Sequence, residues 1–314
     1  MTTSDERELL RETVAALVAK HAPPAAVREA MESERGYDES LWRLLCEQVG
    51  AAALVVPEEY GGGGSLGDAA VVLEELGKGL VPSPLLGTTL AELALLSADD
   101  PDAEALGSLA EGAAIGAVVF DPDYVVNGDI ADIVVATNDG KLDRWTTFSA
   151  EPIVTMDPTR RLARLTSQAT APLGTDPGIA DVAAILLAAE QIGAATRCLE
   201  LTVEYTKERQ QFGRPIGSFQ ALKHRMADLY VAVQAAHAVV NDALEDPSAS
   251  SAALARVAAS EAFSTVAAEG IQLHGGIAIT WEHDVQLYFK RAHGSSQLLG
   301  PPQAHLRRLE SEVF

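Results

Sequence analysis

Two short segments of this chain combine side chains that can hold a large anionic cofactor. Residues 209–220 read RQQFGRPIGSFQ, and residues 272–276 read QLHGG. The first segment places arginines, an aromatic ring and the amide of Gln220 beside a turn and a helix start, where phosphate groups are favoured. The second ends in Gly275 and Gly276, which let a phosphate or a ring approach the backbone closely. The two segments together form a candidate dinucleotide site.

Each segment also has a plainer interpretation. Residues 209–220 would equally connect two helices, with solvated arginines and with Ser218 capping the second helix. The glycine pair Gly275 and Gly276 would equally end a helix as a C-cap. From the residues alone, the binding interpretation and the connector interpretation of the first segment are evenly balanced.

The histidines and cysteines do not have the spacing of a metal site. His274, His283 and His293 are nine and ten residues apart, whereas two ligands on one helix face usually stand four residues apart. Cys46 and Cys198 lie far from each other and form no CxxC motif. We therefore expect neither a bound metal nor a disulfide framework.

The overall charge excludes some classes of partner. The chain has 314 residues and a formal net charge of −22, with an isoelectric point near 4.6. Such acidity would repel nucleic acid and anionic membranes. The first residues are polar rather than signal-like, and no run reaches the roughly 18 apolar residues of a membrane span. We expect a soluble, cytoplasmic protein with no nucleic-acid or membrane partner.

The pattern of apolar residues changes twice along the chain. Residues 1–112 are predicted to form an N-terminal helical domain, with helices near 41–49, 67–80 and 88–96. Residues 113–178 are richer in β-branched residues and turn signals, and they predict a small β domain. Its expected strands cover 115–120, 130–136, 145–148, 153–155 and 161–166.

Residues 179–314 show apolar stripes that alternate steps of four and three, as the helices of an antiparallel bundle do. We expect a C-terminal four-helix bundle, and the fold class is α+β, mostly α. The stripes themselves are interpreted as core.

The motifs in this order resemble the acyl-CoA dehydrogenase family over nearly the whole chain. The family's R-x-x-F-G element corresponds to residues 209–213, its later glutamine and Gly-Gly element to residues 272–276, and an N-domain element to VPEEYGGGG at 56–64. The resemblance implies a helical domain, a middle β domain and a four-helix bundle. It also implies FAD as the cofactor, contacted across a subunit interface. The residues that the resemblance assigns to the FAD of a neighbouring subunit are Arg209, Phe212, Gln220, Gln272, Gly275 and Gly276.

The chain departs from the family where the chemistry takes place. The family's flavin ring rests on a Thr-Glu-Pro-x-x-Gly-Ser-Asp segment, and nothing like it occurs between residues 113 and 176. The family's base is a carboxylate that removes an α-proton while a β-hydride goes to the flavin. An ungapped alignment puts Leu299 at the base position, a gapped one puts His293 there, and the family's second base position falls near Ala183. Glu190 is a weak candidate for a displaced base, and an interhelical polar contact is its preferred interpretation.

These features suggest a subunit without its own catalytic base in a heteromeric FAD-dependent acyl-CoA dehydrogenase. A full-length partner, in an α2β2 assembly, would supply the flavin pocket, the base and most of the acyl-CoA site. By analogy with actinobacterial enzymes, the substrate would be a steroid side-chain CoA thioester. Two alternatives stay open: a self-sufficient homotetramer that uses Glu190 or His293 as base, and a non-catalytic scaffold or CoA-ester-binding module.

Overall fold

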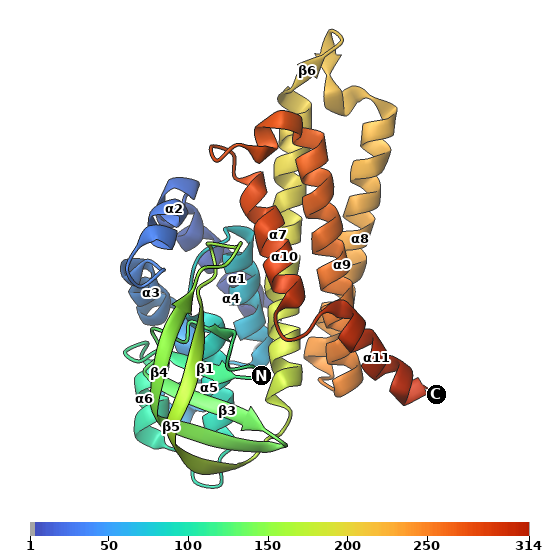
Figure 1. Ribbon diagram of the computed structural model, residues 1–314. Helices are drawn as coiled ribbons and strands as arrows, with labels where there is room; N and C mark the ends of the chain where they lie inside the picture. The colour runs from blue at the N-terminus through green and yellow to red at the C-terminus, as the bar shows by residue number, and fades with distance from the viewer. Residues whose placement is uncertain (1–3, 314) are drawn as a thin grey trace.

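The computed structural model describes residues 4–313, and it has three successive parts (Figure 1). The first part is helical, and side-chain caps start several of its helices. Asp38, Ser65 and Asp102 each accept backbone N–H groups at a helix N-terminus, as capping residues do. Its helices are α1 (Ser4–His21), α2 (Pro24–Glu32), α3 (Glu39–Leu44), α4 (Leu66–Lys78), α5 (Leu85–Leu96) and α6 (Ala103–Ala110).

The second part is a mixed five-stranded sheet in the order β1-β3-β4-β5-β2. β1 and β3 are parallel, and the other neighbours are antiparallel. Asp139 and Gly140 both have positive φ and form the two-residue turn between β3 and β4, a geometry that suits hairpins. The strands are β1 (Gly116–Val119), β2 (Val125–Val126), β3 (Ile133–Asn138), β4 (Lys141–Ile153) and β5 (Leu162–Thr175).

The strand prediction was wrong in one respect. The expected strand 145–148 lies inside β4, and all but the first residue of 161–166 lies inside β5; these are two long strands paired along their whole length. Of the expected strand 153–155, only Ile153 belongs to a strand, as the last residue of β4. Register shifts near Trp145 and Thr147 interrupt the side-chain alternation, because a bulge moves later residues to the other face. The sequence therefore looked like separate strands where the backbone is continuous.

The third part is the predicted bundle. Its main helices are α7 (Ile179–Glu208), α8 (Gln220–Glu245), α9 (Ala249–His274) and α10 (Val285–Gln297), followed by α11 (Pro302–Val313). The predicted fold class, α+β and mostly α, is confirmed, since a small mixed sheet lies between two helical parts. The domain boundaries at 112 and 178 stay a prediction.

One helix cap was predicted wrongly. Ser218 does not cap α8, because it lies in a short 3-10 turn before the helix and its hydroxyl donates to the carbonyl oxygen of Pro215 at 2.7 Å. The residue before α8 is Phe219, which offers no side-chain cap. The serine stabilises the turn rather than the helix start.

α7 is the central helix of the structure. It packs most extensively against α9 and α4 and therefore joins the first and third parts. By length and composition α7 could cross a membrane, but 72% of its most apolar window is buried inside the protein. This burial is typical of the core helix of a bundle.

α4 and α7 cross at two glycines. A Cβ on Gly193 would lie 1.9 Å from the carbonyl oxygen of Glu74, and a Cβ on Gly77 would lie 2.2 Å from that of Glu190. The two backbones therefore approach more closely than any other residue would allow. The contact fixes α7 against the N-terminal helices.

This crossing yields a stability prediction. Gly193→Ala should lower the free energy of unfolding by at least about 1–3 kcal/mol, because the added methyl group forces the two helices apart. Gly107→Ala in α6 is the matched control, since a Cβ there meets nothing within 4 Å and alanine favours a helix. Urea unfolding measures both variants, and equal midpoints for the two would contradict this account of the crossing.

Candidate functional site

A hairpin projects from the end of the bundle, between α7 and α8 (Figure 1). Its strands are β6 (Gln210–Gln211) and β7 (Arg214–Pro215). Phe212, at the turn, has φ of 54° and is 92% exposed. We call residues 209–220 the bundle tip. Most of this ring is open to solvent, which leaves it available for another molecule.

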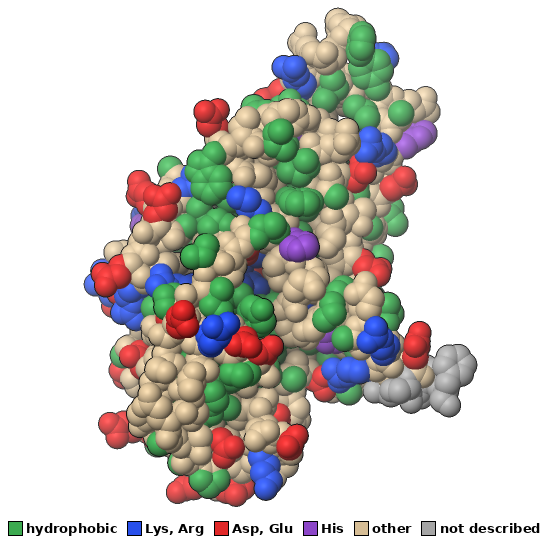
Figure 2. Space-filling model, viewed as in Figure 1, with side chains coloured by type: hydrophobic (Ala, Val, Ile, Leu, Met, Phe, Trp, Pro, Cys, Tyr) green, Lys and Arg blue, Asp and Glu red, His purple; other side chains and the backbone are tan. Residues whose placement is uncertain are grey.

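Aromatic and basic side chains lie together on the bundle tip. The guanidinium of Arg214 stands 4.0 Å from the centre of the Phe219 ring, and Phe212 meets Phe219 edge to face at 6.1 Å. Residues 205–225 contain five lysines and arginines and one acidic residue, in a chain of net charge −22. Figure 2 shows hydrophobic and basic side chains exposed at this end.

The two arginines that could meet an anion are not neutralised by the chain itself. Within residues 4–313, neither Arg209 nor Arg214 forms an ion pair with a carboxylate. Gln220 is exposed at the start of α8, with its amide nitrogen 3.5 Å from a ring nitrogen of His224. The bundle tip therefore offers free cations, an amide and a ring, a set that suits a pyrophosphate and an adenine.

The second predicted segment lies at the C-terminus of α9, at the same end of the bundle. Gln272 is exposed, and Gly275 adopts φ 66° and ψ −143°, a conformation for which glycine is strongly preferred. A Cβ on Gly275 or Gly276 would meet no atom of the chain within 4 Å. The glycines therefore face open space, where a ligand can approach their backbone closely, although the N–H of Gly275 itself is donated to the carbonyl oxygen of Ile271.

The structure brings the two segments to one end of the molecule and places the β sheet near the other (Figure 1). α7 begins directly after β5 and runs for 30 residues before Arg209. At about 1.5 Å per residue, that helix is about 45 Å long. The cofactor-contacting assignments of the six residues stay predictions, but their shared location is a property of the fold.

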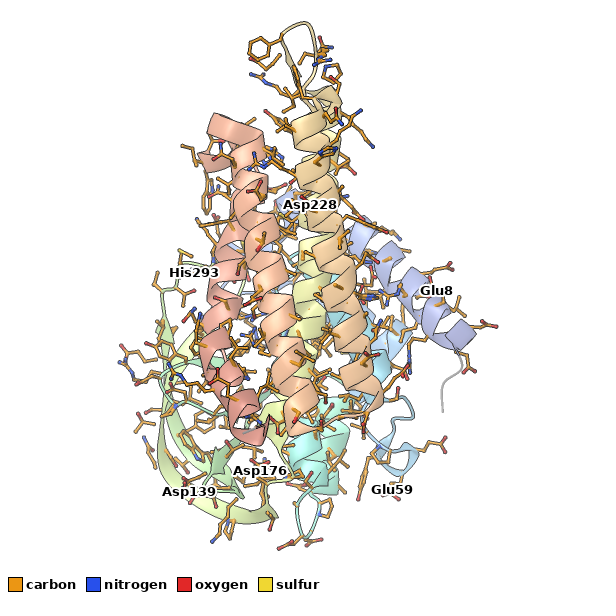
Figure 3. All side chains as sticks on the ribbon, turned by 90° about the vertical axis from the view of Figure 1, so that its right-hand side faces the viewer. Glu8, Glu59, Asp139, Asp176, Asp228 and His293 are labelled. Carbon is orange, nitrogen blue, oxygen red and sulfur yellow. The ribbon has the colours of Figure 1, made fainter. Side chains whose placement is uncertain are left out.

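The positions aligned with the family's base hold no free carboxylate. Ala183 is fully buried in α7. Leu299 follows α10 with φ of 60° and packs, partly buried, against the main core. His293 is exposed and points away from the bundle interior (Figure 3). None of the three places a proton acceptor in an enclosed site.

Glu190 is buried and fully engaged. Its carboxylate pairs with Arg160, which lies just before β5, and with Arg291 of α10 at 3.1 Å. Arg291 also contacts Asp157 at 3.2 Å and donates to the Thr159 hydroxyl at 2.8 Å. An interhelical polar contact was the preferred interpretation of Glu190, and its pairing with Arg291 of α10 is such a contact. The sequence could not identify the two arginine partners, because they lie 30 and 101 residues away from Glu190.

The same side chains close the space between the sheet and the bundle. A cavity there has a volume of about 20 Å³, with Ser83, Asn127, Arg160, Glu190 and Arg291 among its lining residues. That volume holds about one water molecule. A flavin ring or an acyl thioester does not fit in this volume. Burial also lowers the pKa of Arg160, as expected for a side chain in an enclosed site.

A larger groove of about 460 Å³ runs between α1, α4 and α8. Its cationic side chains are already paired, Arg7 with Asp68 at 3.0 Å and Arg11 with Glu75 at 2.9 Å. His237 lies 3.7 Å from Glu74. Within residues 4–313, no group of three His, Cys, Asp or Glu side chains is arranged to hold a metal.

Glu190 can be tested as a structural residue. Glu190→Gln should lower the free energy of unfolding by about 3 kcal/mol, because two buried arginines lose their shared counter-charge. Glu204→Gln is the control, since its ion pair with Arg197 is exposed and exposed pairs contribute less than about 1 kcal/mol. Urea unfolding gives both values. A catalytic Glu190 would instead lose turnover in the isosteric variant with stability unchanged.

Comparisons with known proteins agree with this architecture. The acyl-CoA dehydrogenase N-terminal domain matches residues 4–112, and the acyl-CoA dehydrogenase C-terminal domain matches residues 160–313. The acyl-CoA dehydrogenase IpdE2 of Mycobacterium tuberculosis is 76% identical over 100% of this chain and 99% of its own length.

Two solved structures are also similar over nearly their full length. A variant of the steroid ACAD Tcur3481–Tcur3483 has a TM-score of 0.88 at 29% identity, covering 99% of this chain and 98% of that one. The ChsE4–ChsE5 complex of Mycobacterium tuberculosis has a TM-score of 0.88 at 26% identity, with the same coverage. On its sequence and its fold, this chain belongs to the acyl-CoA dehydrogenase family.

Proposed function

We propose that this chain is the incomplete subunit of a heteromeric FAD-dependent acyl-CoA dehydrogenase. It completes the binding site for the ADP half of an FAD, while a full-length partner subunit provides the flavin-ring pocket, the catalytic base and most of the thioester site. Two of the similar structures, Tcur3481–Tcur3483 and ChsE4–ChsE5, are themselves named as pairs of chains. That likeness supports an acyl-CoA dehydrogenase partner.

One observation carries the proposal: the bundle tip and the sheet lie at opposite ends of α7. Arg160, just before β5, pairs with Glu190 of α7, and Glu190 precedes Arg209 by 19 residues. Along a helix that separation is about 28 Å. An FAD whose phosphates meet Arg209 would therefore rest its ring on another chain rather than on this sheet.

The residues of the tip fit such a half-site. Arg209 and Arg214 can pair with phosphate oxygens, because no carboxylate of the described chain competes for them. The exposed Phe212 can stack on a base or a ring, and the open backbone at Gly275 and Gly276 admits a close contact. When bound, FAD supplies the acceptor for the β-hydride of the acyl group.

In this proposal, the chain itself has no site for the dehydrogenation reaction. The cavity between sheet and bundle is about 20 Å³, and the candidate base positions hold Leu299, Ala183, the exposed His293 and the paired Glu190. The partner would therefore hold the acyl-CoA in an α2β2 assembly. We further propose a bulky steroid-derived CoA thioester as substrate, since one closed site per pair leaves room for a wide one beside it.

The alternatives are less well supported. A self-sufficient enzyme needs a base beside a flavin, and neither Glu190 nor His293 lies free in an enclosed pocket of sufficient size. If the chain were a CoA-ester-binding module, its candidate binding site would be the groove between α1, α4 and α8, which has a volume of about 460 Å³. Its arginines are already paired, so that groove lacks a free cation for a CoA phosphate.

The flavin content of the complex tests the proposal. The chain purified alone should carry little FAD and show no acyl-CoA dehydrogenase activity. Co-expression with the product of an adjacent dehydrogenase-like gene should give a yellow complex with one FAD per pair of chains, counted by absorbance after denaturation. A lone preparation that is yellow and bleaches when acyl-CoA is added would favour the self-sufficient enzyme.

Arg209 gives a sharper prediction. Arg209→Ala should weaken FAD binding by the complex about 10- to 100-fold, since a charge-assisted hydrogen bond contributes about 1.5–3 kcal/mol. Arg43→Ala, an exposed arginine of α3, is the matched control and should leave the affinity unchanged. Flavin fluorescence during titration of the FAD-depleted complex measures both, and an unchanged affinity in Arg209→Ala would refute the half-site.

A further inference from the structure

Tyr205, on the last turn of α7, contacts both candidate nucleotide-binding segments. Its backbone carbonyl oxygen accepts the N–H of Arg209 at 2.9 Å. Its side-chain hydroxyl donates to the carbonyl oxygen of His274 at 3.2 Å. His274 is the last residue of α9 and directly precedes Gly275. One residue therefore links the helix that ends at Arg209 with the helix that ends at the glycine pair.

Ring contacts reinforce this link. The Tyr205 ring stacks on the His274 ring, with centroids 4.3 Å apart and planes 23° apart. His283 meets the edge of the pair, 4.7 Å from His274 and 6.2 Å from Tyr205. Such aromatic pairs are favourable beyond the burial of their surface. The stack therefore holds the end of α9 in one orientation relative to α7.

The hydrogen bond from Tyr205 matters because of where it ends. The last carbonyl groups of a helix have no partner within the helix, and the hydroxyl of Tyr205 provides one for His274. The next residue, Gly275, turns the chain with φ 66° and ψ −143°. The direction of the peptide groups at Gly275 and Gly276 thus depends on how His274 is held.

His274 is held in its neutral form. Its Nδ1 lies 2.7 Å from the carbonyl oxygen of Gly270, so this nitrogen carries the proton. Its Nε2 is buried, with no hydrogen-bond partner among the described residues. A second proton would place a buried positive charge without an acceptor, which is unfavourable.

The surroundings of His274 act in the same direction. Burial lowers the pKa of His274 from its usual 6.5, and the neighbouring His283 lowers it further, while the Gly270 carbonyl opposes them. His283 itself faces Asp284 and Arg28. Since the held form binds a proton less well than a released form, the stack is fully stable above about pH 6.5 and weakens as the pH falls below it.

We propose that Tyr205 and His274 are positioning residues, which orient Arg209 and the Gly275–Gly276 backbone as one unit toward a bound nucleotide, and that protonation of His274 releases this unit. The inference rests on the proposed function, since it assumes that these groups contact FAD. The inference explains why the two segments would act together. It also predicts that FAD binding depends on pH, which a purely structural role of Tyr205 would not predict.

The test uses the FAD-depleted complex with the partner subunit and FAD itself as the probe. Tyr205→Phe keeps the ring and removes the hydroxyl, and it should weaken FAD binding about threefold to tenfold near neutral pH. Tyr205→Leu removes the stack as well and should weaken binding further. Tyr124→Phe, at an exposed tyrosine outside the bundle, is the control and should bind FAD like the unchanged chain.

The pH profile tests the role of His274. FAD affinity of the unchanged complex should fall between about pH 7 and about pH 5, the range in which histidines titrate. His274→Phe keeps a ring for stacking but cannot take up a proton. At neutral pH, the FAD affinity of His274→Phe should stay within about threefold of that of the unchanged complex. The fall in FAD affinity at acidic pH that protonation of His274 causes should be absent in His274→Phe. The Tyr205→Phe variant should still show this fall.

The outcomes separate the two ideas. If Arg209→Ala leaves FAD affinity unchanged, the proposed function is wrong and this inference falls with it. If Arg209→Ala weakens binding while both Tyr205→Phe and His274→Phe match the unchanged complex in affinity and in pH profile, the inference alone is wrong. Thermal unfolding of each variant complex, measured beside FAD binding, shows whether a loss of affinity comes from a loss of fold.

Discussion

The carboxylate of Glu190 lies between two buried arginines, Arg160 and Arg291, and this network sets how the sheet sits against the bundle. Removing three charged groups from water is costly, and the arrangement is tolerated only because each is paired or hydrogen-bonded. Asp157 and Thr159 complete the network from the β side. The result is a closed junction with a cavity of about 20 Å³, where a catalytic site would need open space.

α7 connects this closed junction to the rest of the chain. Its N-terminal half carries Glu190 and Gly193, which fix the sheet and α4 against it. Its C-terminal end carries Tyr205 and leads into Arg209. Because a buried 30-residue helix is stiff, the closed junction and the open bundle tip are held apart. A chain built this way can contribute to a cofactor site on a partner without forming a complete one itself.

The surface charge follows the same division. Most of the chain is acidic, with a formal net charge of −22, and such a charge discourages non-specific contacts with other anionic molecules. The bundle tip is the exception: among the described residues no carboxylate pairs with Arg209 or Arg214, and Phe212 is exposed. Exposing an aromatic ring and leaving two cations without counter-ions brings no stability to the isolated chain. Under the proposed function, such a surface is explained by binding rather than by the fold that carries it.

The sequence alone determined the fold class and the location of the tip, because both depend on local patterns. Apolar stripes in steps of three and four predict the bundle helices, and the order of R-x-x-F-G and Q-L-H-G-G predicts the family. The same local reasoning misplaced the cap at Ser218 and divided β4 and β5, since turns and bulges depend on neighbours. Only the tertiary structure decided the state of Glu190, the size of the junction cavity and the link from Tyr205 to His274. Those features join residues 30 to 101 positions apart, and such distant contacts leave no periodic trace in a single sequence.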